Sequence, residues 1–208
     1  MDLFPLVAAE RVRLSDSLAP LTVDEWEAPS LCAGWSVHVV GAHLNAPWEA
    51  SIPSVILDIA RARSITGGFD RVARRLADRM TPDDCIAGLR IHADSHFTPP
   101  GFGPEAPLTD VIVHGVDMLL PSRGAVGVDP VALATCLEFL GSARAKNFVP
   151  KGLLDGLAVE ASDLDVRVGQ GRQVARGPAL ALCAALCGRP AVLDQLSGEG
   201  VAALRARL

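Results

Sequence analysis

The stretch Leu108–Leu120, LTDVIVHGVDMLL, decides the fold, because it combines a nearly continuous apolar surface with one line of polar groups. Asp110, His114 and Asp117 are spaced i, i+4 and i+7, which places all three on one face of a helix. The residues between them are apolar, and a helix that is apolar nearly all round is expected to be buried. Buried carboxylates and imidazoles are usually paired or bind a metal. The stretch therefore predicts either a satisfied polar network or a set of metal ligands.

The composition favours closely packed helices. The chain has 208 residues, which fits one large domain, or one medium domain with a small appendage. Half of the residues are hydrophobic, but only 4% are aromatic and tyrosine is absent. The core must therefore be built from alanine, valine and leucine, which suit helices packed on helices.

The charge pattern excludes several classes of partner. The net charge is −5, and no basic run or stripe of lysine and arginine occurs between aromatic residues, so no nucleic acid is expected to bind. No uncharged apolar run reaches the ~18 residues that span a bilayer, so no membrane is expected as a partner. The opening sequence lacks a basic region and reaches Glu10 and Arg11 too early for a signal peptide. We expect a cytoplasmic protein that is a monomer or a homodimer.

The five cysteines indicate free thiols rather than disulfides. Their number is odd and no C-x-x-C spacing occurs, which fits a reducing compartment. Cys183 and Cys187 lie in a run of alanine and leucine, so we interpret them as small hydrophobic residues of a core.

Helical spacing of apolar residues predicts a mainly α fold over residues 1–150. Thr22, Ser36 and Thr81 are expected N-caps, and Gly67 with Gly68 is expected to interrupt the helices. The predicted helices cover residues 3–18, 37–63 with possible breaks at Pro47 and Pro53, 70–80, 82–95, 107–120 and 130–146.

The pattern changes after Pro150. Residues 156–162 and 163–169 alternate apolar and polar, as half-buried strands do, and a third short strand is expected at 173–174. A helix at 178–186 and two short helical turns follow. We predict a small α+β lobe over residues 151–208, with the domain boundary near residue 151.

A second buried-looking helix contains a histidine, His43. In helix bundles, metal sites are built from inward side chains on facing helices, often a carboxylate and a histidine at short spacing. Asp110 and His114 provide such a pair, and His43 could complete it; alternatively, His43 is a hydrogen-bonded core imidazole. His92 and His96, also spaced i, i+4, are interpreted as a solvated helix end and are kept as reserve ligands.

Three stretches resemble a known family: LTVDEWEAPSLCAGWSVHVVGAHL (21–44), PLTDVIVHGVDML (107–119) and GRPAVLDQLSGEGVAALRA (188–206). They are similar to the mycothiol-dependent maleylpyruvate isomerase family, within the DinB-like superfamily of metal-binding four-helix bundles. The resemblance implies metal ligation by His43, Asp110 and His114. The family commonly has glutamate where this chain has Asp110. Asp117 matches a recurrent acid that either orients a ligand or caps a neighbouring helix.

The resemblance also implies a mechanism. A divalent metal, zinc or alternatively nickel, would bind the small-molecule thiol mycothiol as a thiolate, which would attack an electrophilic small-molecule substrate. The enzyme would then be a mycothiol-dependent transferase or isomerase. No cysteine of the chain lies on the ligand helices, and Cys32, just before the His43 helix, is interpreted as a packing thiol.

Two other functions are consistent with the same residues. The first is a non-catalytic metal- or ligand-binding bundle. The second is a metal-dependent hydrolase, which needs a general base near a water molecule; Asp117 and His96 are the candidates. The loop from Thr98 to Pro107 is expected to cover the site.

Overall fold

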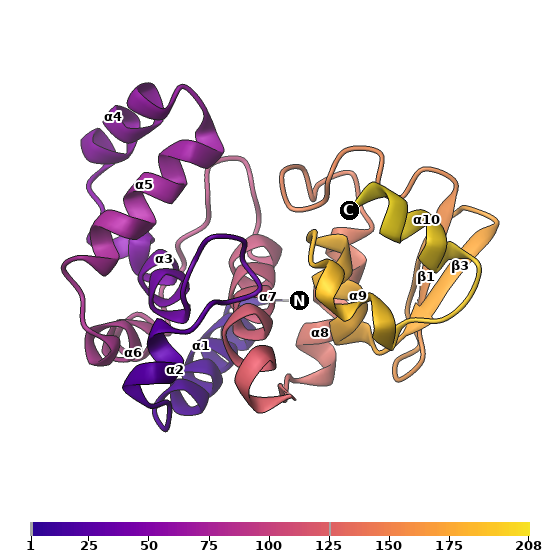
Figure 1. Ribbon diagram of the computed structural model, residues 1–208, viewed down its shortest axis with the longest axis horizontal. Helices are drawn as coiled ribbons and strands as arrows, with labels where there is room; N and C mark the ends of the chain where they lie inside the picture. The colour runs from indigo at the N-terminus through magenta and orange to yellow at the C-terminus, as the bar shows by residue number, and fades with distance from the viewer. Residues whose placement is uncertain (1, 125) are drawn as a thin grey trace. The chain divides into compact units, whose positions relative to one another are not determined.

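The computed structural model describes residues 2–124 and 126–208, and it shows a mainly helical chain with one small sheet (Figure 1). The predicted fold class is therefore confirmed. The elements are α1 (Phe4–Leu18), α2 (Val23–Glu27), α3 (Val37–Glu49), α4 (Ile52–Ala62), α5 (Ile65–Ala77), α6 (Pro82–Ile91), α7 (Glu105–Arg123), α8 (Pro130–Leu140), β1 (Leu157–Ala161), β2 (Arg167–Gly169), β3 (Gln173–Gly177), α9 (Ala179–Leu186), the 3-10 helix η1 (Pro190–Gln195) and α10 (Gly200–Arg207).

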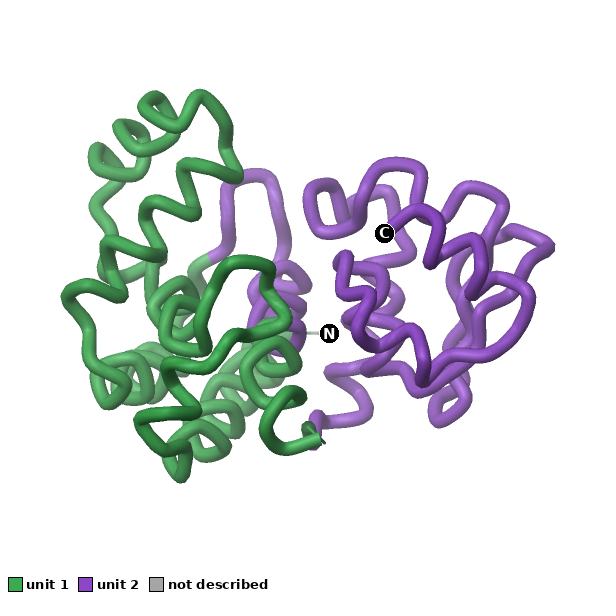
Figure 2. Tube along the Cα trace, viewed as in Figure 1, with its two compact units in different colours: residues 1–97, 114–126 green, residues 98–113, 127–208 purple. Residues whose placement is uncertain are grey.

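The chain divides into two compact units, residues 1–97 with 114–126 and residues 98–113 with 127–208 (Figure 2). This division does not follow the predicted boundary near residue 151. The reason is that α8 packs against α9 and β2, which groups it with the C-terminal part. The assignment of functional domains to 1–150 and 151–208 stays a prediction.

The first unit is organised around α3, which packs against α2, α5 and α6, while α1 packs against α6 and α4 against α5. The predicted N-caps are confirmed. The Ser36 hydroxyl accepts a hydrogen bond from the Val39 amide at 3.3 Å, and Thr22 and Thr81 each form a capping box with an acidic residue three positions later. Local sequence thus fixes where these helices begin.

Gly41 lets α3 approach its neighbours closely. A Cβ atom at this position would lie 2.9 Å from the Trp26 ring and 3.4 Å from the Met118 methyl group of α7. Any larger residue would therefore push α3 away from Trp26. His43 lies two residues after this point of close approach, which is why the packing at Gly41 bears on the site.

Several predicted helix ends are wrong. Gly67 and Gly68 lie in the first turn of α5 instead of interrupting the helices, because the Ser64 hydroxyl caps that turn. The helix predicted to end at 95 ends at Ile91, where the buried guanidinium of Arg11 donates to the carbonyls of the residues that follow. The helix predicted to end at 146 ends at 140, and the one predicted to end at 120 continues to 123.

The second unit contains the predicted strands. The sheet has the order β2-β1-β3, with β2 antiparallel and β3 parallel to β1, and Val159 pairs with Val168 on one side and Ala175 on the other. On β1, Glu160 accepts from Arg176 and Arg167, and these bonds, Arg176 foremost, lower the pKa of the Glu160 carboxyl. Among the described residues, no helix is both long and apolar enough to cross a membrane.

Candidate metal centre

The connector before α3 is held in place by α5. The Trp35 indole donates to the Asp70 carboxylate at 2.7 Å, and Arg74 donates to the same carboxylate at 3.0 Å. Arg74 also donates to the Gly34 carbonyl at 2.9 Å, where glycine adopts a φ of +79°. These bonds fix the backbone that leads into the His43 helix.

Pro121 explains how the same connector is tied to α7. A proline inside a helix has no N–H to donate to the carbonyl four residues earlier, which here is that of Asp117. The Leu31 amide donates to the Asp117 carbonyl instead, at 3.1 Å. The proline therefore opens an acceptor that draws the connector against α7, one turn after His114.

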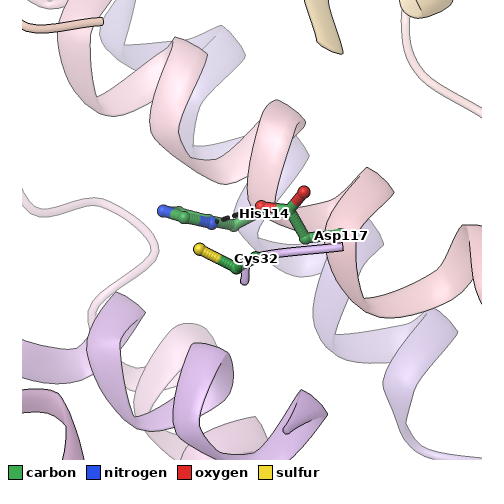
Figure 3. A group of neighbouring side chains, drawn as sticks. All are labelled: Cys32, His114 and Asp117. Atoms are coloured by element: carbon green, nitrogen blue, oxygen red, sulfur yellow. Dashed lines mark hydrogen bonds and ion pairs between the residues drawn. The ribbon is translucent and has the colours of Figure 1, made fainter. Parts of the chain in front are cut away.

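His114 and Asp117 form a buried pair. The His114 Nδ1 atom lies 2.8 Å from Asp117 Oδ2, the His114 side chain is 10% exposed, and that of Asp117 is fully buried (Figure 3). A carboxylate in this position favours the tautomer that donates from Nδ1. The lone pair of Nε2 is then available to a ligand. This is the arrangement that orients histidine ligands in many metal sites.

His43 lies beside His114. Their ring centroids are 5.0 Å apart, with an angle of 79° between the ring planes. Trp35 contacts both imidazoles, with ring centroids 5.1 Å from His43 and 6.5 Å from His114. The anchored indole therefore lies against the histidine pair and restricts the orientation of both rings.

Three side chains can hold one cation. His43, Asp110 and His114 each offer a ligand atom, and these atoms lie within 4.8 Å of one another. Asp110 lies one turn before His114 on the unbroken helix α7, so the helix itself fixes the spacing of this pair. Two imidazoles and one carboxylate suit a zinc-like ion and leave a coordination position open. The residues fit the expected metal, and the shorter aspartate still reaches the group. Their role as ligands stays a prediction.

Cys32, which we interpreted from the sequence as a packing thiol, lies in a second group of potential ligands. Its Sγ atom, His114 and Asp117 form a second group whose possible ligand atoms lie within 4.8 Å of one another (Figure 3). Residue spacing gives no sign of this, because the contact depends on the backbone bond from Leu31 to Asp117. The thiol is half-buried and not part of a disulfide.

The reserve ligands lie elsewhere. His92 stacks on Trp48 with ring centroids 4.6 Å apart, and His96 stacks on Phe4 at 3.9 Å. Among the residues that the structure describes, neither belongs to a group of three potential ligands. These stacking contacts are consistent with the interpretation that both histidines lie outside the metal site.

The N-terminal part of the chain is similar in sequence to a known domain. Residues 7–95 match the mycothiol maleylpyruvate isomerase N-terminal domain. This part of the chain belongs to that family. The match contains α3 with His43, and it ends before α7, so it does not cover Asp110 or His114. No curated protein sequence matches the chain.

Two solved structures are similar in fold to most of the chain, including the part after residue 95. One is a mycothiol-dependent maleylpyruvate isomerase, with 18% identity and a TM-score of 0.55. The other is a histidine-to-alanine mutant of a mycothiol-dependent maleylpyruvate isomerase, with 16% identity and a TM-score of 0.57. Each comparison covers 94% of this chain and 90% of the other. At this identity the likeness shows a shared fold.

Proposed function

We propose that this protein is a metal-dependent enzyme that uses mycothiol as cosubstrate, of the isomerase or thiol transferase type. The observation that supports it is the group formed by His43, Asp110 and His114, whose ligand atoms lie within 4.8 Å of one another. It occurs in a chain whose first helices match the N-terminal domain of the mycothiol-dependent family. Zinc is the proposed ion, with nickel as the alternative.

The charge of the site suits a thiol. Two neutral imidazoles and one carboxylate leave a bound divalent cation with a net charge near +1. Such a cation, when bound, lowers the pKa of a thiol and so prepares a nucleophile at neutral pH. The residues of the chain provide the orientation: Asp117 holds His114 through Nδ1, and Trp35 lies against the imidazoles of His114 and His43.

The reaction requires an electrophilic alkene. The sulfur forms a bond to one alkene carbon, and the electron pair of the double bond moves into the conjugated carbonyl group. Rotation about the resulting single bond, followed by expulsion of the sulfur with its electron pair, restores the double bond in the other geometry and regenerates the thiolate. If the carbon–sulfur bond persists and the enolate takes up a proton, the product is a conjugate.

The hydrolase alternative receives less support from the geometry. Asp117 is engaged with His114, and His96 is stacked on Phe4, so neither general-base candidate faces a position for an attacking water. The described cysteines form no disulfide, which suits the proposed location in the reducing cytoplasm.

The test measures thiol binding and turnover separately. Zinc-loaded wild type should bind mycothiol in a calorimeter and isomerise maleylpyruvate, whereas His114→Ala should do neither. His92→Ala, a histidine outside the group, is the matched control and should behave as wild type. A zinc-loaded wild type that does not bind thiol would overturn the enzyme proposal and support a non-catalytic metal-binding protein.

A further inference from the structure

Helix α4 exposes an apolar outer face. Its outer face contains Ile52, Ile56 and Leu57, which are 76%, 62% and 48% exposed. Pro53 and Ala60 lie on the same arc of the helix and are exposed as well. This apolar face, defined by Ile52, Pro53, Ile56, Leu57 and Ala60, points away from α5, the helix on which α4 packs.

The inner face of α4 contains both apolar and charged side chains. Ile59 packs on Gly68 of α5. Asp58 is 4% exposed, and its two carboxylate oxygens lie 2.8 Å from Arg75 and 3.5 Å from Arg71 of α5. A surface helix normally turns its apolar stripe inward only. The additional apolar outer face of α4 indicates that something covers it, because a contiguous apolar patch on a soluble protein usually marks an interaction site.

We propose that the apolar face of α4 is the contact between two copies of this chain, which pair their α4 helices antiparallel about a two-fold axis at Ile56. In such an arrangement, a residue of α4 in one copy lies opposite the residue of the other copy whose number, added to its own, gives 112. Ile56 then packs on Ile56 of the second copy, and Ile52 packs on Ala60. The large and small side chains alternate, which lets the two helices interdigitate.

The charges at the ends of α4 agree with this orientation. Glu49 precedes the helix and is exposed, and the exposed Arg61 and Arg63 lie at its end. Within the described residues none of the three makes an ion pair. Glu49 is the last residue of α3, so an antiparallel pair brings the acidic start of α4 in one copy to the end with Arg61 and Arg63 in the other. A parallel pair would bring like charges together instead.

The exposed apolar area suits the centre of a dimer contact. Ile52, Ile56 and Leu57 present roughly 300 Å² of apolar side chain, which is as large as the largest apolar patch on many monomers. A standard interface buries about 800 Å² per partner. The three large side chains therefore supply the apolar centre, and the charged ends of α4 supply the rim.

Sedimentation velocity on the full chain, over about 1 to 100 μM, tests the proposal. The apparent molecular mass of the wild type should be twice the 21.8 kDa of one chain. Ile56→Glu places two carboxylates against each other on the axis and should weaken the association at least tenfold. Ile91→Glu is the matched control, because Ile91 is a 75% exposed isoleucine of α6 outside this face, and it should remain dimeric.

A charge reversal tests the orientation. Glu49→Arg alone should weaken the dimer, and adding Arg63→Glu in the same chain should restore it at unchanged net charge. A monomeric wild type, or a dimer that Ile56→Glu leaves intact, would overturn the proposal. Flotation of the monomer with anionic phospholipid vesicles, lost in Ile56→Glu, would also overturn it and would identify a membrane surface as the occupant. Thermal melts followed by circular dichroism confirm that each variant is folded.

Discussion

Replacing Asp117 by asparagine separates the two roles proposed for this residue. Asn has nearly the same shape, so the packing around a fully buried side chain changes little. What changes is the partner of His114 Nδ1, which loses a charged acceptor at 2.8 Å. If Asp117 orients His114 toward a metal, the variant should bind metal less tightly, since the imidazole is less basic and its tautomer is less strongly fixed.

The magnitude follows from the geometry. Removing the partner that orients a histidine ligand usually weakens metal affinity 10- to 100-fold. This corresponds to about 1.4 to 2.8 kcal/mol of binding free energy. Hydrogen bonds to charged groups contribute about 1.5 to 3 kcal/mol, so the range is consistent with the loss of one such bond in a buried setting.

The assay is competition for zinc against a chromophoric chelator, together with thermal unfolding of the metal-free protein. The account predicts weaker zinc binding by Asp117→Asn and a metal-free melting temperature close to that of the wild type. Asp165→Asn, at an exposed aspartate between β1 and β2, serves as the control and should change neither quantity. Wild-type zinc affinity with a clearly lowered melting temperature would refute the reasoning and support a structural cap.

Three further predictions concern packing and titration. Gly41→Ala should destabilise the protein and weaken zinc binding, because the new methyl group would lie 2.9 Å from the Trp26 ring. This is the opposite of the usual effect of alanine in a helix. Calorimetric melting measures the loss of stability, and chelator competition measures the loss of zinc affinity. Thr81→Ala should cost about 1 kcal/mol in urea unfolding at neutral pH, as the loss of an N-cap does. Hydrogen bonds from Thr81, the backbone one foremost, lower the pKa of Asp84, so this cap contributes its full stabilisation above the ordinary aspartate pKa. The difference in unfolding free energy between Thr81→Ala and wild type should therefore shrink as pH falls through the lowered pKa. A difference that grows in acid would contradict this. Burial raises the pKa of the Cys85 thiol to about 12, so a thiol reagent should modify Cys85 only after unfolding, as peptide mass spectrometry would show.

Local signals predicted much of the fold. Capping residues, helical spacing and the alternation of β1 and β2 each depend on a few neighbouring residues, so Thr22, Ser36 and Thr81 could be identified as caps from the sequence. Helix ends were missed where a distant residue decides them. The end of α6 depends on Arg11, which lies about eighty positions earlier.

The candidate site, like the fold, could be predicted from the sequence only where local spacing determines it. The spacing of Asp110, His114 and Asp117 on one helix could be predicted, since it is a property of helix geometry. The proximity of His43 to His114 was expected from the resemblance of two stretches to one family, and the ring contact agrees with it. The position of Cys32 could not be predicted, because it depends on a long-range backbone bond that Pro121 makes possible.

Metal content tests the central claim most directly. The protein should be purified without a histidine tag, and the metal bound per chain measured by mass spectrometry, beside His43→Ala, His114→Ala and the control His92→Ala. The account predicts close to one zinc or nickel ion per chain in the wild type and the control, and its loss in the other two variants. A wild type that stays empty after incubation with these ions would contradict the account, and His43, Asp110 and His114 would then form only a polar network.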